Sequence, residues 1–163
     1  MLDDDVRIGD ETFTLAVRLI GEQLEKSDGD ILIFVPGMFE IKKLKSFILN
    51  SNLHINPQCV VEVHSAYSDD LHRKLFIENF GNKIIIATNI GESSITLPYC
   101  KTVIDFCLTR KNIMVKQKGY SRFETRVASK SNLLQRAGRV GRTSDGEVFR
   151  LIPKALFPKL EEF

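Results

Sequence analysis

The nine residues from Gln135 to Thr143 concentrate the groups best suited to bind an anion. They read QRAGRVGRT and contain three arginines, two glycines and one glutamine. On a helix, with about 100° per residue, Gln135, Arg139 and Arg142 fall within about 60° of one another, opposite an apolar side. Guanidinium groups match phosphate oxygens, and an arginine facing a transferring phosphoryl group stabilises its charge. The stretch predicts a phosphate-facing helix, with a solvated basic helix as the simpler alternative.

The segment from Thr88 to Thr96 is the second candidate for phosphate chemistry. It carries four hydroxyls, one amide and one carboxylate in nine residues, directly after an apolar run that is typical of a buried strand. Hydroxyls and free N–H groups at a strand-to-helix turn suit the phosphate oxygens of a nucleotide or of a nucleic-acid backbone. The alternative is a helix N-cap in which Asn89 and Glu92 form a capping-box-like pair, and both can hold together.

Two features of a complete nucleotide site are missing from the sequence. It contains no G-x-x-x-x-G-K-[ST] motif to surround a triphosphate, and no pair of aspartates follows a strand in the manner of a Mg²⁺ site. Three cysteines without a C-x-x-C pair predict neither a disulfide framework nor a zinc site, so we expect no bound metal and three buried thiols. The phosphate-facing stretch is therefore half of a site, and the other half belongs to another domain or chain.

Length and composition are those of one globular domain. The chain has 163 residues, 43% hydrophobic and 27% charged, and no apolar run approaches the roughly 20 residues that cross a bilayer. No signal-peptide pattern begins the chain, so we expect a cytoplasmic or nuclear setting without a membrane partner. Residues 1–30 hold nine acids against three bases, whereas residues 101–150 hold twelve Lys or Arg against four acids. The basic half predicts an anionic partner, and a solvated basic face is the alternative.

Alternating apolar patterns predict a three-layer α/β domain with a mostly parallel sheet. Short apolar runs indicate strands buried on both faces, with helical spacing between them, and ligands of such sheets bind beyond the carboxyl ends of the strands. The turn signal Lys118-Gly119-Tyr120 predicts an antiparallel hairpin. Expected helices cover residues 11–26, 38–50, 69–80 (with Ser68 as N-cap) and the arginine-rich stretch; expected strands cover 31–35, 59–63, 83–88, 102–106, 113–115, 123–127 and 146–152.

Three stretches resemble motifs of the DEAH-box and related DExH RNA helicases of superfamily 2. ILIFVPGMFEI at residues 31–41, KIIIATNIGESSITLP at 83–98 and QRAGRVGRT at 135–143 are similar to motifs IV, V and VI, in the same order. The resemblance covers nearly the whole chain. It implies a RecA-like three-layer sandwich with a hairpin extension, in which residues 1–163 form a single helicase C-terminal domain. This is the second RecA-like lobe, separated from the first lobe and from winged-helix and ratchet domains.

The resemblance also implies nucleotide-side roles for individual residues. ATP and Mg²⁺ would bind between the lobes, and both require the missing first lobe. Gln135, Arg139 and Arg142 match the residues on the γ-phosphate side, with Arg142 the better arginine-finger candidate. Ser94 and Gly138 belong to the same nucleotide site. Phe76 matches an aromatic that stacks on adenine, although an aromatic at helical spacing can equally be a core residue.

RNA-side roles follow from the same resemblance. The hairpin of residues 113–127 is similar to the family's strand-separating hairpin. The expected contacts to RNA come from polar side chains that follow strands: Ser65, Thr88, Asn89 and Thr96.

The run VIDFCLTR at residues 103–110, taken with Pro98, looks most like the Tudor-domain helicases of germline small-RNA silencing, the Spindle-E type. It implies an ATP-dependent RNA helicase in piRNA and transposon silencing, in the cytoplasm and its perinuclear RNA granules. The isolated lobe is expected to be monomeric and inactive as an ATPase. The alternatives are a non-catalytic RNA- or partner-binding lobe of a degenerate helicase and a DNA-directed translocase of the same superfamily.

Overall fold

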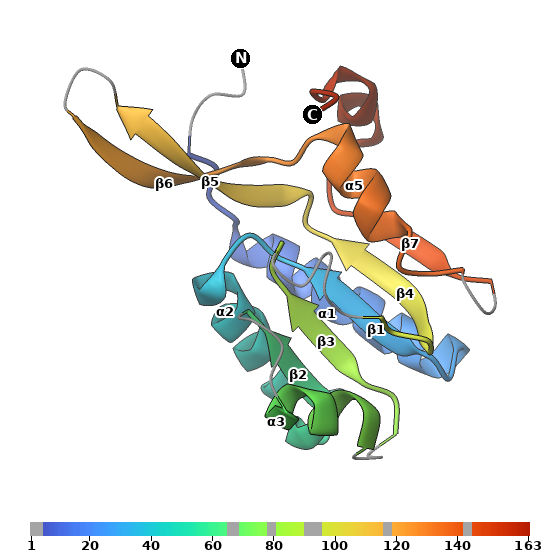
Figure 1. Ribbon diagram of the computed structural model, residues 1–163. Coiled ribbons are helices and arrows are strands. Elements are labelled where there is room, and N and C mark those ends of the chain that lie inside the picture. The colour runs from blue at the N-terminus through green and yellow to red at the C-terminus, as the bar shows by residue number, and fades with distance from the viewer. Residues whose placement is uncertain (1–4, 65–68, 78–80, 90–95, 116–118, 142–144) are drawn as a thin grey trace.

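Five parallel strands form the centre of the molecule, with helices on both faces (Figure 1). The computed structural model describes residues 5–64, 69–77, 81–89, 96–115, 119–141 and 145–163. The helices are α1 (Asp10–Lys26), α2 (Met38–Leu49), α3 (Asp69–His72) with a π-helical turn (Arg73–Ile77), α5 (Lys130–Ala137) and 3₁₀ turns at Pro57–Cys59 and Lys154–Lys159. The strands are β1 (Asp30–Phe34), β2 (Val60–Val63), β3 (Ile84–Ala87), β4 (Cys100–Asp105), β5 (Leu108–Val115), β6 (Tyr120–Val127) and β7 (Glu147–Arg150).

The strand order of the main sheet is β2-β3-β1-β4-β7, and every neighbouring pair is parallel. The central strand β1 aligns Ile33 with Ile86 of β3 and with Ile104 of β4. Strands this apolar are stable only where both faces are covered, and all five residues of β1 are buried. The predicted α/β class with a mostly parallel sheet is confirmed, and the carboxyl ends of β3 and β4 flank that of β1.

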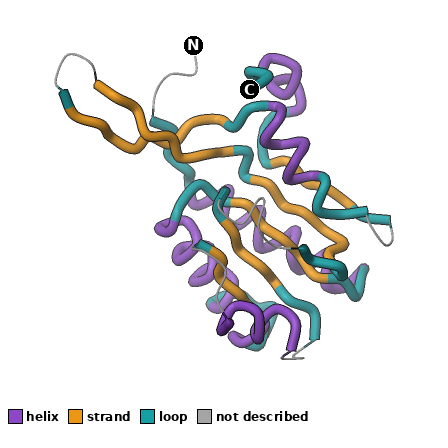
Figure 2. Tube along the Cα trace, in the orientation of Figure 1, coloured by secondary structure: helices purple, strands orange, loops and turns teal. Residues whose placement is uncertain are grey.

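Two apolar clusters, one on each face of the sheet, account for the three layers. Helices α1 and α2 cover one face, where Phe13 and Ile41 pack on alternate residues of β1 such as Ile33. The other face buries Phe34 of β1 together with Leu75 of the π-helical turn. Figures 1 and 2 show α1 and α2 behind the sheet and α3 and α5 in front of it.

Strands β5 and β6 form a separate two-stranded antiparallel sheet that projects from the body of the molecule (Figure 1). The predicted hairpin is confirmed, but its strands are longer than the two short apolar segments expected, because the added residues are mostly polar. The N-terminal segment holds the hairpin base: Val6 N–H donates to Thr125 O at 2.9 Å, and the Asp5 carboxylate accepts from Thr125 N–H at 2.8 Å.

The other predicted elements differ from the structure mainly at their ends. Helix α3 begins at Asp69, and its expected N-cap Ser68 lies outside the described residues. Cys59, Cys100 and Cys107 are buried free thiols, as predicted. Among the described residues no helix is long and apolar enough to span a membrane, and no three His, Cys, Asp or Glu side chains come together as metal ligands.

Candidate functional site

Helix α5 carries the start of the arginine-rich stretch but ends before most of it. Ser129 caps the helix by accepting a hydrogen bond from Asn132 N–H at 3.3 Å, and the last regular residue is Ala137. Beyond it, Arg139 N–H bonds to Arg136 O and Val140 N–H to Ala137 O, so the chain tightens into three-residue turns. Gly141 then adopts φ +75°, a left-handed conformation that stops a right-handed helix. The predicted helix through Thr143 is therefore wrong.

The solvent side of α5 presents Gln135, as the helical spacing predicted. Gln135 is exposed, and its neighbour Leu134 keeps 60% of its surface exposed, whereas Leu133 is fully buried. Gly138 closes the helix through its N–H bond to Leu134 O at 3.0 Å, and the half-buried Arg139 follows. The exposed side of α5 therefore presents an amide and one apolar side chain to solvent.

The segment after α5 leads away from the carboxyl ends of the strands. Val140 packs with the apolar cluster of Leu97 and Cys100, at the amino end of β4. A Cβ placed on Gly146 would lie only 3.1 Å from Lys101 O of the same strand. Helix α5 runs antiparallel to β4, so the stretch spans the face of the sheet. The described end of the arginine-rich stretch, at Val140 and Gly141, therefore lies near the amino end of β4.

Arg136 is the residue of this stretch that does reach the carboxyl ends. Its side chain is 0% exposed and forms an ion pair with Asp105, whose side chain is 1% exposed, at an Nη1–Oδ1 distance of 2.8 Å. Its Nη2 donates to Leu108 O at 3.2 Å and also to the Asn89 side-chain oxygen. The guanidinium carbon lies 5.2 Å from the centre of the Phe34 ring. One buried cation thus connects α5 with the ends of β1, β3 and β4.

Asn89 extends this connection to the hairpin. Its amide nitrogen donates to the Thr109 hydroxyl of β5, while its oxygen accepts from Arg136. Both ends of the Asn89 side chain therefore bond inside the lobe, and its predicted contact to RNA stays a prediction. Thr88, which precedes it, is 8% exposed, and its hydroxyl finds no hydrogen-bond partner among the described residues.

The Asp105 carboxylate also fixes the turn between β4 and β5. Its Oδ1 accepts Cys107 N–H at 2.7 Å, and Cys107 has φ +59°, which is uncommon for a residue other than glycine. Burial raises the pKa of the Asp105 carboxyl, and the Arg136 charge and the Cys107 amide act in the opposite direction. Burial likewise raises the pKa of the Cys100 thiol to about 12 and that of Cys107 further, so both remain protonated at neutral pH.

The remaining predicted residues divide into exposed ones and ones outside the described ranges. Thr96 is exposed at the start of the segment that leads into β4. Phe76 is 41% exposed in the π-helical turn, so it lies at the surface and not in the core. Ser65, Ser94 and Arg142 lie outside the described residues, and their predicted roles stay predictions.

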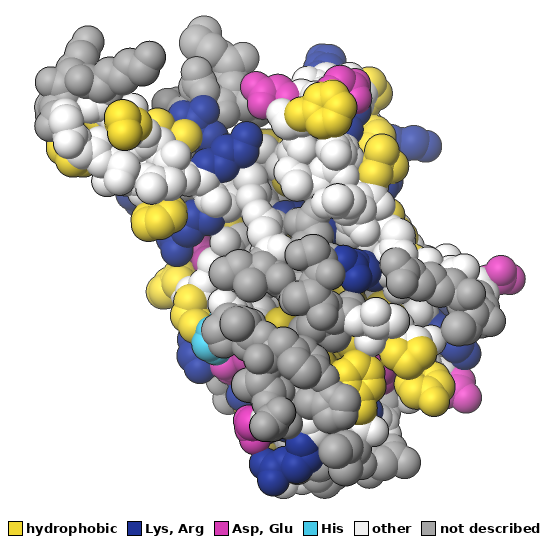
Figure 3. Space-filling model, in the orientation of Figure 1, with side chains coloured by type: hydrophobic (Ala, Val, Ile, Leu, Met, Phe, Trp, Pro, Cys, Tyr) yellow, Lys and Arg dark blue, Asp and Glu magenta, His cyan; other side chains and the backbone are white. Residues whose placement is uncertain are grey.

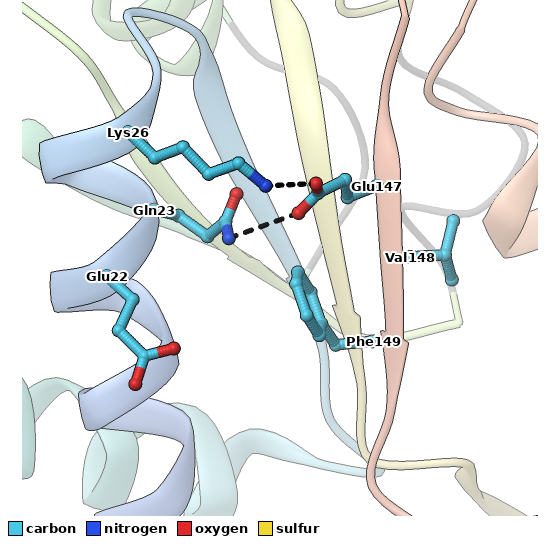
Figure 4. A pocket seen from close by; sticks show the side chains of 6 residues that line it. All are labelled: Glu22, Gln23, Lys26, Glu147, Val148 and Phe149. Carbon is cyan, nitrogen blue, oxygen red and sulfur yellow. Dashed lines mark hydrogen bonds and ion pairs between the residues drawn. The ribbon is translucent and has the colours of Figure 1, made fainter.

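A hollow of about 510 Å³ opens between α1 and β7, and none of the described site residues lines it (Figure 4). Its charged groups satisfy one another, because the Glu147 carboxylate accepts hydrogen bonds from Lys26 and from Gln23, the latter at 3.2 Å. Phe149 faces α1 and forms part of the apolar cluster on that side. The hollow lies at the surface, where helix α1 packs beside the edge strand β7.

The sequence reasoning missed Asp105, Thr109 and Arg136, and two signals could have found the charged pair. Arg136 lies about 60° from Leu133 on a helical projection, on the apolar side of α5. Asp105 stands inside the apolar run of residues 103–106. A charge within an apolar pattern is buried only when it is paired, so two such charges of opposite sign are candidate partners.

Comparison with known proteins fits this geometry. A family model described as the helicase conserved C-terminal domain matches residues 11–144, which include every predicted site residue. The chain belongs to the helicase C-terminal domain family. It is 37% identical, over 93% of its length, to "Probable ATP-dependent RNA helicase spindle-E" of Drosophila ananassae, of which it covers 12%. It is 38% identical, over 82% of its length, to "ATP-dependent RNA helicase TDRD9" of Mus musculus, of which it covers 10%.

The fold of this helicase domain is similar to that of the Escherichia coli DExH-box NTPase HrpB, with a TM-score of 0.78 and 25% identity over 98% of this chain and 20% of that one. The predicted RecA-like sandwich and the resemblance to a DExH second lobe of the Spindle-E type are both confirmed. The helicase domain spans about a tenth of the length of the curated relatives that it matches.

Proposed function

We propose that this chain is the second motor lobe of an ATP-dependent RNA helicase. The observation that carries the proposal is the position of α5. Its exposed side presents Gln135, its buried side is tied by Arg136 to the end of β3, and Arg139 follows its last turn. The resemblance of residues 135–143 to motif VI implies that these positions face nucleotide, and the relatives named above are called ATP-dependent RNA helicases.

The side chains present fit one wall of a triphosphate site. An exposed amide at Gln135 and the guanidinium of Arg139 are donors that match phosphate oxygens, and Arg142 would add a second guanidinium. The chain has no phosphate-binding loop, so a first lobe would hold ATP and its Mg²⁺ against this wall. Hydrolysis of the bound ATP would supply the free energy for movement along RNA. The arginines would stabilise the charge that develops on the transferring phosphoryl group.

RNA would lie along the carboxyl ends of the strands and the hairpin. The buried hydroxyl of Thr88, which has no partner among the described residues, and the exposed Thr96 are the described hydroxyls of the second motif proposed to face a sugar–phosphate backbone. Figure 3 shows Lys and Arg side chains gathered over the base of the hairpin. Met114 and Phe123 of the hairpin are 72% and 70% exposed, which suits a wedge that meets unpaired bases. Phe76, exposed in the π-helical turn, is available to stack on adenine.

The finer assignments are part of the same proposal. The similarity to spindle-E and TDRD9 supports a role in germline piRNA and transposon silencing, in cytoplasmic and perinuclear RNA granules. Residues 1–163 would act as one domain that is monomeric by itself. In the full-length protein it would join a first RecA-like lobe and the winged-helix and ratchet domains.

Replacing Arg142 tests the proposal. In the full-length helicase, Arg142→Ala should lower RNA-stimulated ATP turnover about 10³- to 10⁵-fold, because one guanidinium stabilises the transition state, while RNA affinity stays within a few-fold. The control is Arg18→Ala, which removes an exposed arginine of α1 that pairs with Glu22. Initial-rate ATPase assays and RNA-binding titrations provide both readouts. Unchanged turnover in Arg142→Ala would contradict the arginine-finger role of this residue, and absence of turnover in the wild-type protein would favour a non-catalytic RNA- or partner-binding lobe.

A further inference from the structure

The buried network around Arg136 connects the proposed RNA side of the lobe with its proposed nucleotide side. On the RNA side it includes Asn89, next to Thr88, and Thr109 at the start of the hairpin. On the nucleotide side it includes α5, in which Arg136 is the direct neighbour of the exposed Gln135. The Thr109 side chain bonds to Asn89, and Asn89 bonds to Arg136, so hydrogen bonds connect these three side chains in series.

The geometry of this network is unusual for a device that only stabilises the core. A buried ion pair adds little net stability over well-packed apolar side chains, but removal of one partner is strongly destabilising because it leaves an uncompensated buried charge. Here a single oxygen, Asp105 Oδ1, accepts hydrogen bonds from the Arg136 guanidinium and from the backbone N–H of Cys107, which has a left-handed backbone conformation. The position of α5 is thereby tied to the turn from which the hairpin starts.

Neighbouring observations favour a mechanical link. Thr109 is 4% exposed, but the β5 residues that follow it alternate between exposed and half-buried, so it stands where the hairpin leaves the core. Thr88 carries a buried hydroxyl without a partner among the described residues, directly beside the network. A ligand that bonds to Thr88 or moves the hairpin would act first on Asn89 and Thr109.

We infer that Arg136 is a positioning residue that couples the hairpin and the end of β3 to helix α5, so that RNA contact sets the placement of Gln135 and Arg139. The inference rests on the proposed helicase function and adds to it a physical route between the two ligands. Arg136 itself touches neither ligand. It acts through Asn89 and Thr109 on one side and through the helix that carries it on the other.

A pair of substitutions at Thr109 in the full-length helicase tests the route. Thr109→Val keeps the size and burial of the side chain but removes the hydroxyl that accepts from Asn89. Thr109→Ser keeps the hydroxyl and is the matched control. Coupling free energies between sites correspond to about 5- to 150-fold. Thr109→Val should therefore lower the RNA stimulation of ATP turnover at least 5-fold, while RNA-free turnover stays within about 2-fold and RNA affinity within about 3-fold. Thr109→Ser should retain the stimulation.

Other outcomes separate a failure of the proposed helicase function from a failure of the proposed coupling through Arg136. If wild-type protein shows no RNA-stimulated turnover, the proposed function fails. If wild type is stimulated and Thr109→Val keeps that stimulation, the coupling inference is wrong, and equal losses of RNA-free and stimulated turnover also overturn it because they indicate general damage. Should Thr109→Val fail to fold in a thermal melt, Arg136→Lys, which keeps a charge for Asp105 but loses the fork that reaches Asn89, decides by the same assay.

Discussion

At the scale of residues, the buried side chain of Arg136 links several segments of this lobe. Arg136 is fully enclosed and meets Asp105, Leu108 O and Asn89, so three segments of the chain share its donors. A guanidinium presents five donors in a rigid fork, and no other side chain can serve that many acceptors at fixed angles. Burial of the guanidinium is unfavourable in free energy, and the ion pair with Asp105 offsets this penalty.

Asparagine substitutions at two aspartates of the sheet measure how much the Asp105–Arg136 ion pair adds to stability beyond a simple hydrogen bond. Asp105→Asn keeps an acceptor for Cys107 N–H but leaves Arg136 buried without a counter-charge, which should lower the free energy of unfolding by about 3–5 kcal/mol. Asp30→Asn is the control, because Asp30 is also buried but accepts only the Lys83 amide at 2.9 Å, so its loss should stay near 1 kcal/mol. Urea unfolding followed by circular dichroism measures both. Equal losses would contradict the importance of the pair.

At the scale of elements, the end of helix α5 decides where the arginines lie. The helix stops at Ala137, so Arg139 occupies a turn and not the next position of a helical stripe. The two glycines of the stretch differ in conformation: Gly138 has φ −65°, which any residue adopts, whereas Gly141 has φ +75°. The second glycine therefore turns the chain toward β7, and the first does not require glycine for its backbone.

Alanine substitutions at the two glycines should accordingly differ. Gly141→Ala should lower the free energy of unfolding by about 1–2 kcal/mol, because a left-handed conformation is strained for a residue with a Cβ. Gly138→Ala should change it by less than about 1 kcal/mol, since a gain in helix propensity is offset by a 3.3 Å approach to Gln135 O. Urea midpoints of the two variants test this difference. A larger loss of unfolding free energy in Gly138→Ala than in Gly141→Ala would mean that the backbone conformation of the two glycines does not determine their effect on stability.

At the scale of the whole molecule, the proposed function predicts that this lobe needs a second lobe in order to work. The exposed Leu134 and Gln135 of α5 and the projecting hairpin face away from the apolar clusters. The chain holds arginines suited to a triphosphate but no loop to bind one. Under the proposed function, a first lobe would close over the α5 side, and this closure would couple nucleotide state to movement.

The purified chain should therefore hydrolyse no ATP, with or without RNA, and should bind RNA only weakly and with a strong dependence on salt. Full-length protein assayed in parallel should show RNA-stimulated turnover, which controls for the RNA and nucleotide used. Turnover by residues 1–163 alone, retained after removal of contaminating ATPases, would contradict a shared site.

Much of this protein was determined by the sequence itself. Helices and parallel strands follow from local apolar periodicity, since an apolar run such as residues 31–34 of β1 is stable in a strand only when both faces are covered. The anion-binding chemistry of the arginine-rich stretch follows from residue type, and its motifs sufficed to indicate the family that the comparisons confirm. Burial of the three cysteines also followed from their type and spacing.

Tertiary structure alone decided which polar residues turn inward. Arg136 and Asp105 are 31 positions apart, and Asn89 is 47 positions from Arg136, so a local pattern can mark the two charges as buried but cannot show that these three side chains meet. The pairing depends on the sheet order, which brings the carboxyl ends of β3 and β4 to either side of β1, and on the antiparallel course of α5 across them. Side chains from distant positions meet only after the backbone has fixed their distances, and for that reason the inner contacts of the site could not be predicted from sequence alone.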